Sequence, residues 1–290
     1  MLDGFVPWPE AFVKKYKEAG YWEDLTMGDV FNRFVGRYGP RVALVYGDQK
    51  ISYEQLGQRA VKMAYQMIKS GFKTYDRLVM NLPNIPELPY VYYGSLLIGV
   101  IPIMSLVAHR WAEISHFAQT ADASAHAIPA QFGKFDFQAL AQDVRTQVPG
   151  VKITLVAGRP RYPDMISIDD LLAEEIDHNE AQNLIQKYRP NPMEPAVLQL
   201  SGGTTGVPKL IPRTHNDYHY NSKQNARVCG VNEDTVLLVQ PPLAHNFARS
   251  CPGMTGVLMN GGRVVLTTDV SPEEAFRLIE KEKVTNLPIV

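Results

Sequence analysis

The chain has 290 residues, and its 29 Lys and Arg residues nearly balance its 30 Asp and Glu residues, giving a formal net charge of -1. Hydrophobic residues make up 45% and charged residues 20%, which is typical of globular proteins and argues against a disordered or collagen-like chain. The balanced charge gives no electrostatic reason to expect nucleic acid or an anionic membrane as a partner. The two cysteines, Cys229 and Cys251, are too few for a disulfide framework and fit a reducing cytoplasm.

One uncharged segment, residues 88–107, is long enough to cross a bilayer and must be weighed as a membrane helix. Gly99 and Pro102 interrupt it. A helix from about Asn84 is therefore expected to stop at Gly99, and the run VIPIM should follow as a short buried strand. The N-terminus, MLDGFVPWPE, has no apolar core of a secretory signal. These features predict a cytoplasmic protein without a membrane span.

Short apolar strands alternate with amphipathic helices in the first part of the chain. Ser52 is a plausible N-cap for one of these helices, and Gly71 ends it. Strands are expected over residues 41–46, 49–52, 76–82, 100–104, 125–128 and 151–156, and helices over 53–70, 111–120 and 135–148. Residues 158–194 are richer in Pro, acidic and amide side chains and predict a surface connection with one short helix, over 167–174.

The alternation then resumes. Strands are expected over residues 196–200, 209–212, 235–239 and 263–267, and helices over about 216–228 and 272–282. A further strand should begin at 284–290. The pattern predicts an α/β fold with mainly parallel sheets and helices on their faces. We expect a first subdomain over 1–157, the connection 158–194, and a second subdomain over 195–290. The second is expected to be incomplete, because the chain ends within the apolar run NLPIV.

The strongest chemical signal is the segment LQLSGGTTGVPKLIPR, in which an apolar strand leads into a glycine-rich loop. Glycines allow backbone N–H groups to approach an anion, while hydroxyls add donors and a lysine adds positive charge. The loop therefore predicts binding of a triphosphate or pyrophosphate, although its spacing is not that of a Walker A motif. The candidate residues are Ser201, Gly202, Gly203, Thr204, Thr205, Gly206 and Lys209.

The string SGGTTGVPK resembles the phosphate loop of the adenylate-forming acyl and aryl ligases. The segments ISYEQL and LIGVIPIM resemble two further motifs of that family, in the same order. The segments GFVPWPE, LIPRTHNDY and PPLAHNFARSCPG resemble one branch, the 2,3-dihydroxybenzoate- and salicylate-AMP ligases of siderophore synthesis. The resemblance covers essentially the whole chain and implies the large N-terminal region of that fold.

The resemblance also implies an aryl-acid site at His245, Asn246 and Cys251. Amino-acid-activating relatives have an Asp at the position of Asn246, whereas a neutral Asn offers no counter-charge to an amine but can hydrogen-bond a hydroxyl or carboxylate. Cys251 aligns with a position that is Ser in typical dihydroxybenzoate ligases and Cys in several salicylate ligases. This difference favours salicylate, but both acids stay open.

In the family, an aryl carboxylate reacts with MgATP to give an aryl-AMP and pyrophosphate. The aryl group then passes to the phosphopantetheine thiol of a carrier protein, or to coenzyme A. The family's Mg²⁺-holding Glu, its ribose-binding Asp, its hinge and its C-terminal Lys would all lie beyond Val290. We therefore expect this chain to be about the N-terminal half of such an enzyme and inactive alone, with no catalytic residue assigned within it. An aryl-CoA ligase and a fragment that only binds a ligand are the alternatives.

Two sequence features that contain histidines are expected to be structural rather than functional. The tripeptide His109-Arg110-Trp111 follows the VIPIM strand, where a site is possible, but packing at a helix start is favoured. His215 and His219 have the i, i+4 spacing of metal ligands. No third ligand is evident, so a solvated helix face is the preferred interpretation.

Overall fold

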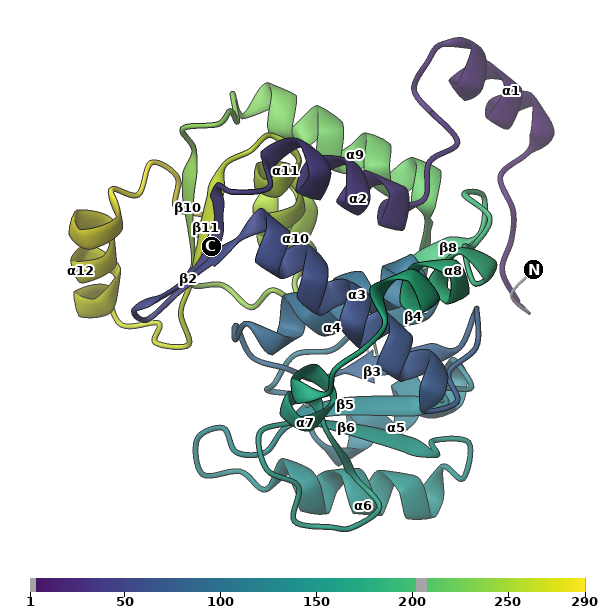
Figure 1. The fold of residues 1–290 in the computed structure, drawn as a ribbon. Coiled ribbons are helices and arrows are strands. Elements are labelled where there is room, and N and C mark those ends of the chain that lie inside the picture. Colours follow the sequence, from purple (N-terminus) through teal and green to yellow (C-terminus); the bar gives the residue numbers. More distant parts are fainter. Residues whose placement is uncertain (1–3, 202–207, 290) are drawn as a thin grey trace.

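The structure is a computed structural model that describes residues 4–201 and 208–289. Within these ranges the strands form two sheets, which confirms the predicted mainly parallel α/β fold (Figure 1). The larger sheet has the strand order β7-β6-β5-β3-β4-β8-β9 and is parallel except for its last pair. Its strands are β3 (Arg77–Met80), β4 (Ile101–Met104), β5 (Ala125–Pro129), β6 (Ile153–Ala157), β7 (Ile166–Ser167), β8 (Pro195–Leu200) and β9 (Leu210–Thr214).

The smaller sheet has the order β10-β11-β1-β2. Only the β1–β2 hairpin is antiparallel in this described sheet. Its strands are β1 (Val42–Tyr46), β2 (Gln49–Ser52), β10 (Val236–Val239) and β11 (Arg263–Leu266). Both sheets therefore take strands from residues 1–157 and from residues 195–290. The division into subdomains at 158–194 stays a prediction.

The helices cover the sheets and connect them. They are α1 (Glu10–Glu18), α2 (Met27–Tyr38), α3 (Tyr53–Lys69), α4 (Glu87–Leu97), α5 (Trp111–Thr120), α6 (Phe137–Gln147), α7 (Ile168–Ala173), α8 (His178–Lys187), α9 (His215–Val228), α10 (Asn246–Ser250), α11 (Gly253–Met259) and α12 (Pro272–Glu282). The sequence interpretation did not predict α1, α2, α8, α10 or α11. Ser52 caps α3 as predicted, because its hydroxyl accepts the backbone N–H of Gln55.

Side chains of the larger sheet alternate between two apolar layers. On β3, Leu78 and Met80 belong to the main core with α3 and α4, whereas Val79 packs with α5 residues on the opposite face. Strands covered on both faces read as continuous apolar runs, which is why the sequence predicted them well. Helices α3 and α4 lie between the two sheets in Figure 1, and their residues share one core with residues of both.

The uncharged segment 88–107 forms the predicted helix and strand. Helix α4 ends at Leu97, and Gly99 follows with a φ of 69° that a residue with a Cβ adopts at a cost. Strand β4 then begins at Ile101. In the part of the chain that the structure describes, no helix is long and apolar enough to cross a membrane.

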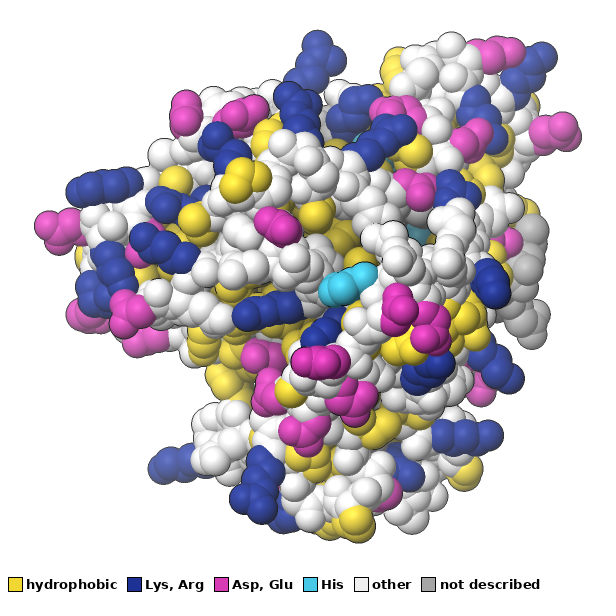
Figure 2. Space-filling model, in the orientation of Figure 1, with side chains coloured by type: hydrophobic (Ala, Val, Ile, Leu, Met, Phe, Trp, Pro, Cys, Tyr) yellow, Lys and Arg dark blue, Asp and Glu magenta, His cyan; other side chains and the backbone are white. Residues whose placement is uncertain are grey.

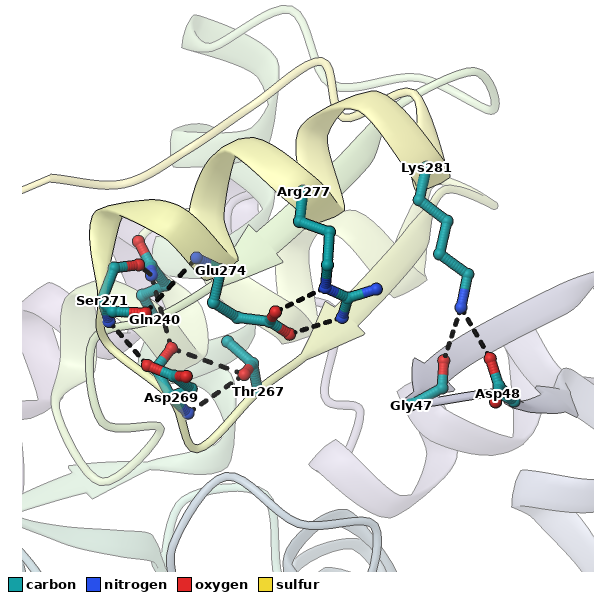
Figure 3. A network of polar contacts seen from close by, with 9 residues as sticks. All are labelled: Gly47, Asp48, Gln240, Thr267, Asp269, Ser271, Glu274, Arg277 and Lys281. Atoms are coloured by element: carbon teal, nitrogen blue, oxygen red, sulfur yellow. Dashed lines mark hydrogen bonds and ion pairs between the residues drawn. The ribbon is translucent and has the colours of Figure 1, made fainter.

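A polar network fixes α12 beside the smaller sheet (Figure 3). Ser271 caps the helix as predicted, by accepting the backbone N–H of Glu274. Lys281 in the last turn contacts the Asp48 carboxylate at 2.7 Å, in the turn between β1 and β2. After this helix the predicted strand at 284–290 is reduced, over its described residues, to a single parallel bridge between Asn286 and Leu237.

Candidate functional site

The predicted phosphate loop connects β8 to β9 at one end of the larger sheet. At its base, the Ser201 N–H donates to the Lys209 carbonyl at 3.0 Å, and the Lys209 N–H donates to the Ser201 hydroxyl at 2.8 Å. Lys209 is exposed. Of the candidate residues, Gly202, Gly203, Thr204, Thr205 and Gly206 lie outside the described residues.

A cavity of about 230 Å³ lies beside the base of this loop. It is lined by Met104, Leu106, His109, Gln199, Leu200, Ser201, Pro208, Ala244, His245 and Asn246. Most of these residues come from or follow the carboxyl ends of β4 and β8, where open α/β sheets bind ligands. The others are Pro208, before β9, and three residues at the start of α10 and just before it. The structure thus brings Ser201, His245 and Asn246, predicted from two separate motifs, to one cavity.

The segment that carries His245 and Asn246 is held to the larger sheet by one buried amide. Asn84, in the turn after β3, accepts the N–H of Leu243 at 2.8 Å. Its Nδ2 lies 3.2 Å from the Val239 carbonyl and 3.1 Å from the Pro241 carbonyl. His245 then caps α10, since its Nδ1 accepts the N–H of Phe247 at 3.3 Å. These bonds hold the segment after β10, a strand of the smaller sheet, against the strand ends of the larger sheet.

Asn246 and Cys251 are joined directly. The Asn246 Nδ2 donates to the Cys251 Sγ at 3.0 Å, and the thiol donates to the Asn221 Oδ1 at 3.0 Å. Cys251 does not itself line the cavity and lies behind Asn246. Burial raises the pKa of the Cys251 thiol, which keeps it protonated and argues against a role as a nucleophile.

His109 lines the cavity, although the sequence favoured a purely structural role for it. Its Nδ1 accepts the Leu106 N–H at 3.1 Å, and its ring packs edge-on against Phe117. Burial lowers the pKa of His109, so that a neutral ring faces the cavity. Its position just after β4, at a strand end in a parallel sheet, was the available signal.

The expectation of a solvated face for His215 and His219 is wrong. Both side chains are buried, and the His215 Nδ1 accepts the Met27 N–H at 3.0 Å. Burial lowers the pKa of His215 to about 3 and that of His219 to about 4. The polar composition of α9 concealed this, because the buried face of the helix is itself polar.

Sequence reasoning also missed the side chains behind Asn246. The Asn246 Oδ1 accepts hydrogen bonds from Gln199 Nε2 at 2.6 Å and from the Tyr218 hydroxyl at 3.0 Å. Tyr218 in turn accepts from Arg249 Nε at 3.0 Å. Gln199 could have been noticed as a polar residue near the end of an apolar strand, directly before the loop. For Tyr218 and Arg249 no local signal exists.

A larger cavity of about 600 Å³ lies elsewhere, between the N-terminal segment and α9. Four aromatic residues of that segment line it, namely Trp8, Tyr16, Tyr21 and Trp22. None of the predicted site residues does. Its lining also includes Arg213 and Asp217, but its size alone does not make it the site, since Ser201, His245 and Asn246 meet in the smaller cavity.

The described residues do not form a metal site. In residues 4–201 and 208–289, no group of three or more His, Cys, Asp or Glu side chains is placed to hold a metal ion. Mg²⁺ prefers oxygen ligands such as carboxylates together with substrate phosphates. The residues present therefore do not fit a Mg²⁺ site by themselves.

On the face shown in Figure 2, acidic and basic side chains are interspersed.

Comparison with known proteins extends these observations. The 2,3-dihydroxybenzoate-AMP ligase of Bacillus subtilis is 40% identical over 290 residues, which are 100% of this chain and 52% of that protein. The salicylyl-CoA synthase / salicylate adenylyltransferase of a Streptomyces species is 40% identical over 283 residues, 98% of this chain and 51% of that protein. The apo structure of Mycobacterium smegmatis MbtA matches with a TM-score of 0.89 at 34% identity. The match covers 99% of this chain and 52% of that one.

The chain spans about half the length of the curated relatives that it matches. The family model of the AMP-binding enzymes matches residues 31–290, and so takes in both sheets, the phosphate-loop segment and the cavity beside it. The chain therefore belongs to the AMP-binding enzyme family.

Proposed function

We propose that the protein containing this chain activates a hydroxylated benzoic acid, salicylate or 2,3-dihydroxybenzoate, as its acyl adenylate. The observation that carries the proposal is one cavity lined both by Ser201, at the base of the loop, and by His245 and Asn246. We infer that a phosphate chain and an aromatic acid would lie side by side in this cavity. The names of the relatives agree with this substrate class.

The reaction forms a bond between a carboxylate oxygen of the acid and the α-phosphorus of ATP. The bond from that phosphorus to the bridging oxygen breaks, and pyrophosphate leaves with the electron pair. The backbone and hydroxyls of residues 201–206 would donate hydrogen bonds to the β- and γ-phosphates, and Lys209 would balance their charge. Mg²⁺ would neutralise further charge on these phosphates, and it would be held by groups other than the described residues of this chain.

In the same cavity, His245 and Asn246 would hold the aryl acid, with Cys251 setting the space and polarity behind Asn246. The Asn246 amide carries no charge and has hydrogen-bond partners on both of its polar atoms. It offers no partner for an ammonium group, so amino acids should be rejected.

We further propose that the activated acyl group passes to the phosphopantetheine thiol of a carrier protein in siderophore biosynthesis. Coenzyme A is the alternative acceptor, which the name of the Streptomyces relative favours. We place the protein in the cytoplasm, because both cysteines are free thiols and a reducing compartment keeps them so.

ATP–pyrophosphate exchange tests the proposal, because it reports adenylation without any acceptor. It should be run with salicylate, 2,3-dihydroxybenzoate, benzoate and phenylalanine, on this chain and on the product of the whole reading frame that contains it. We expect exchange with a hydroxybenzoate by the longer protein and none by the 290-residue chain alone. Exchange with phenylalanine only would overturn the proposal, and turnover by the purified chain would refute its expected inactivity.

The Cys251→Ser variant tests the choice between the two acids. The serine hydroxyl is smaller than the thiol and a stronger hydrogen-bond donor, so the ratio of 2,3-dihydroxybenzoate to salicylate exchange should rise. Cys229→Ser is the matched control, because Cys229 is exposed at the end of α9. An equal change of this ratio in both variants would show that Cys251 does not contribute to the aryl site.

A further inference from the structure

A chain of hydrogen bonds behind the cavity ends at a fully buried arginine. Arg249 has 0% of its side chain exposed. Its Nη1 donates to the carbonyl oxygens of Leu243 at 3.0 Å and Ala244 at 2.8 Å, and its Nε donates to the Tyr218 hydroxyl at 3.0 Å. All three acceptors are uncharged oxygens. A buried charge is costly to keep, which raises the question of what this one does.

The guanidinium determines the direction of the bonds that follow. Because it can only donate, the Tyr218 oxygen must accept from it, and the single hydroxyl hydrogen is left to donate onward. The next atom, 3.0 Å away, is the Asn246 Oδ1. With the carbonyl oxygen of the Asn246 amide in that position and Nδ2 facing Cys251, the hydroxyl hydrogen has its acceptor. A reversed amide would take this acceptor away from the Tyr218 hydroxyl hydrogen and turn an N–H group toward Gln199 Nε2, which is also a donor.

A count of hydrogen bonds then shows what Asn246 can offer to a ligand. Its carbonyl oxygen already accepts from Gln199 and from Tyr218. One of its two N–H groups donates to Cys251. An amide oxygen accepts two bonds and an amide nitrogen donates two, so one N–H group of this amide is left for a ligand.

We propose that Arg249 is a positioning residue for substrate selection, acting through the Tyr218 hydroxyl to lock the Asn246 amide so that it offers a ligand only an N–H donor. The inference rests on the proposed function and deepens it. Asn246 should select an acid with an acceptor beside the carboxyl group, such as the oxygen of an ortho-hydroxyl. An ortho-amino group is a poor acceptor, because its lone pair is delocalised into the ring.

The test compares salicylate with anthranilate, which differ only in this ortho group. The variants are Tyr218→Phe, Arg249→Met and Arg249→Lys, with Arg277→Met as the control. Arg277 is a half-exposed arginine paired with Glu274 on α12 (Figure 3). Exchange kinetics are measured on the product of the whole reading frame, with the melting temperature of each variant recorded beside them.

The unaltered protein should favour salicylate in kcat/KM. Tyr218→Phe and Arg249→Met should each lower the salicylate-to-anthranilate ratio about tenfold, the scale of one hydrogen bond. Arg249→Lys should keep most of the ratio, since an ammonium group is also a pure donor. The control should leave it unchanged. An unchanged ratio in a folded Tyr218→Phe protein would overturn the proposal, even where Arg249→Met does not fold.

Failure of the proposed function gives a different result. If the unaltered protein activates neither acid, the proposed function is wrong, and the side-chain amide signals of Asn246 in ¹H–¹⁵N spectra of the 290-residue chain decide the positioning role. We then expect Tyr218→Phe to shift these signals and to speed their exchange with solvent, whereas Arg277→Met should not. If the Asn246 amide signals were the same in Tyr218→Phe as in Arg277→Met, the positioning role would be refuted.

Discussion

The buried His126 on β5 makes the stability of the fold depend on pH. It is 1% exposed, and among the described residues neither ring nitrogen has a hydrogen-bond partner. Burial lowers its pKa from 6.5 to about 3. Since the unfolded chain binds a proton below about pH 6.5 and the folded chain does not, the stabilising contribution is complete above that pH. It is lost progressively as the pH falls toward 3.

The size of this effect follows from the two pKa values. One pH unit within the window costs about 1.4 kcal/mol, so the free energy of unfolding should be about 2 kcal/mol lower at pH 5 than at pH 8 on account of His126 alone. His126→Phe replaces the imidazole by an uncharged ring. Its free energy of unfolding should therefore fall about 2 kcal/mol less than that of the unaltered chain over the same range.

Urea denaturation at pH 8 and pH 5 measures the difference. The other buried histidines, His215 and His219, contribute equally to both proteins and cancel from the comparison. His178→Gln is the control, because His178 is exposed at the start of α8 and its loss removes a histidine without a buried ring. The same pH dependence in the unaltered chain and in His126→Phe would refute the reasoning.

Three further substitutions test the parts that position the site. Asn84→Ala should cost about 2–4 kcal/mol in urea denaturation, because it leaves buried backbone groups without partners. Lys209→Gln should raise the KM for ATP in the exchange assay about tenfold, the scale of a lost charged hydrogen bond, whereas the exposed Lys152→Gln should not. Gly99→Ala should cost about 1–3 kcal/mol, since its φ is 69° and its Cβ would lie 2.9 Å from Pro190; an unchanged melting temperature would contradict this.

Periodicity predicted the strands and the helices with an apolar stripe, because those elements bury their apolar residues against a sheet. It also predicted the helix α9, HNDYHYNSKQNARV, but not its burial, since the buried residues of α9 include His215, Asn216 and Ser222. A helix that buries polar side chains looks exposed in sequence. For α2 a signal was present, since Thr26 and Asp29 form a capping box at its start.

The candidate site divides in the same way. Ser201, His245 and Asn246 were predicted because each belongs to a short motif whose residues lie close together in sequence. Tyr218 lies 28 residues from Asn246 and joins it only because α9 packs beside α10. Arg249 is three residues from Asn246 and bonds the nearby carbonyls of Leu243 and Ala244, but its bond to the Tyr218 hydroxyl spans 31 residues. Such contacts depend on tertiary packing and have no local pattern.

The cavity owes its shape to the junction of two sheets. Met104 and Leu200 reach it from strand ends of the larger sheet, whereas His245 comes from the segment that follows β10 of the smaller one. A site shared in this way keeps its geometry only if the two sheets keep their positions relative to each other. Asn84 contributes to this, because it bonds the β10 segment to the turn after β3. The Asn84→Ala substitution should therefore weaken substrate binding as well as lower stability. Its effect on the KM for the aryl acid should exceed that of Gly99→Ala, which strains the chain before β4 but leaves this bond intact.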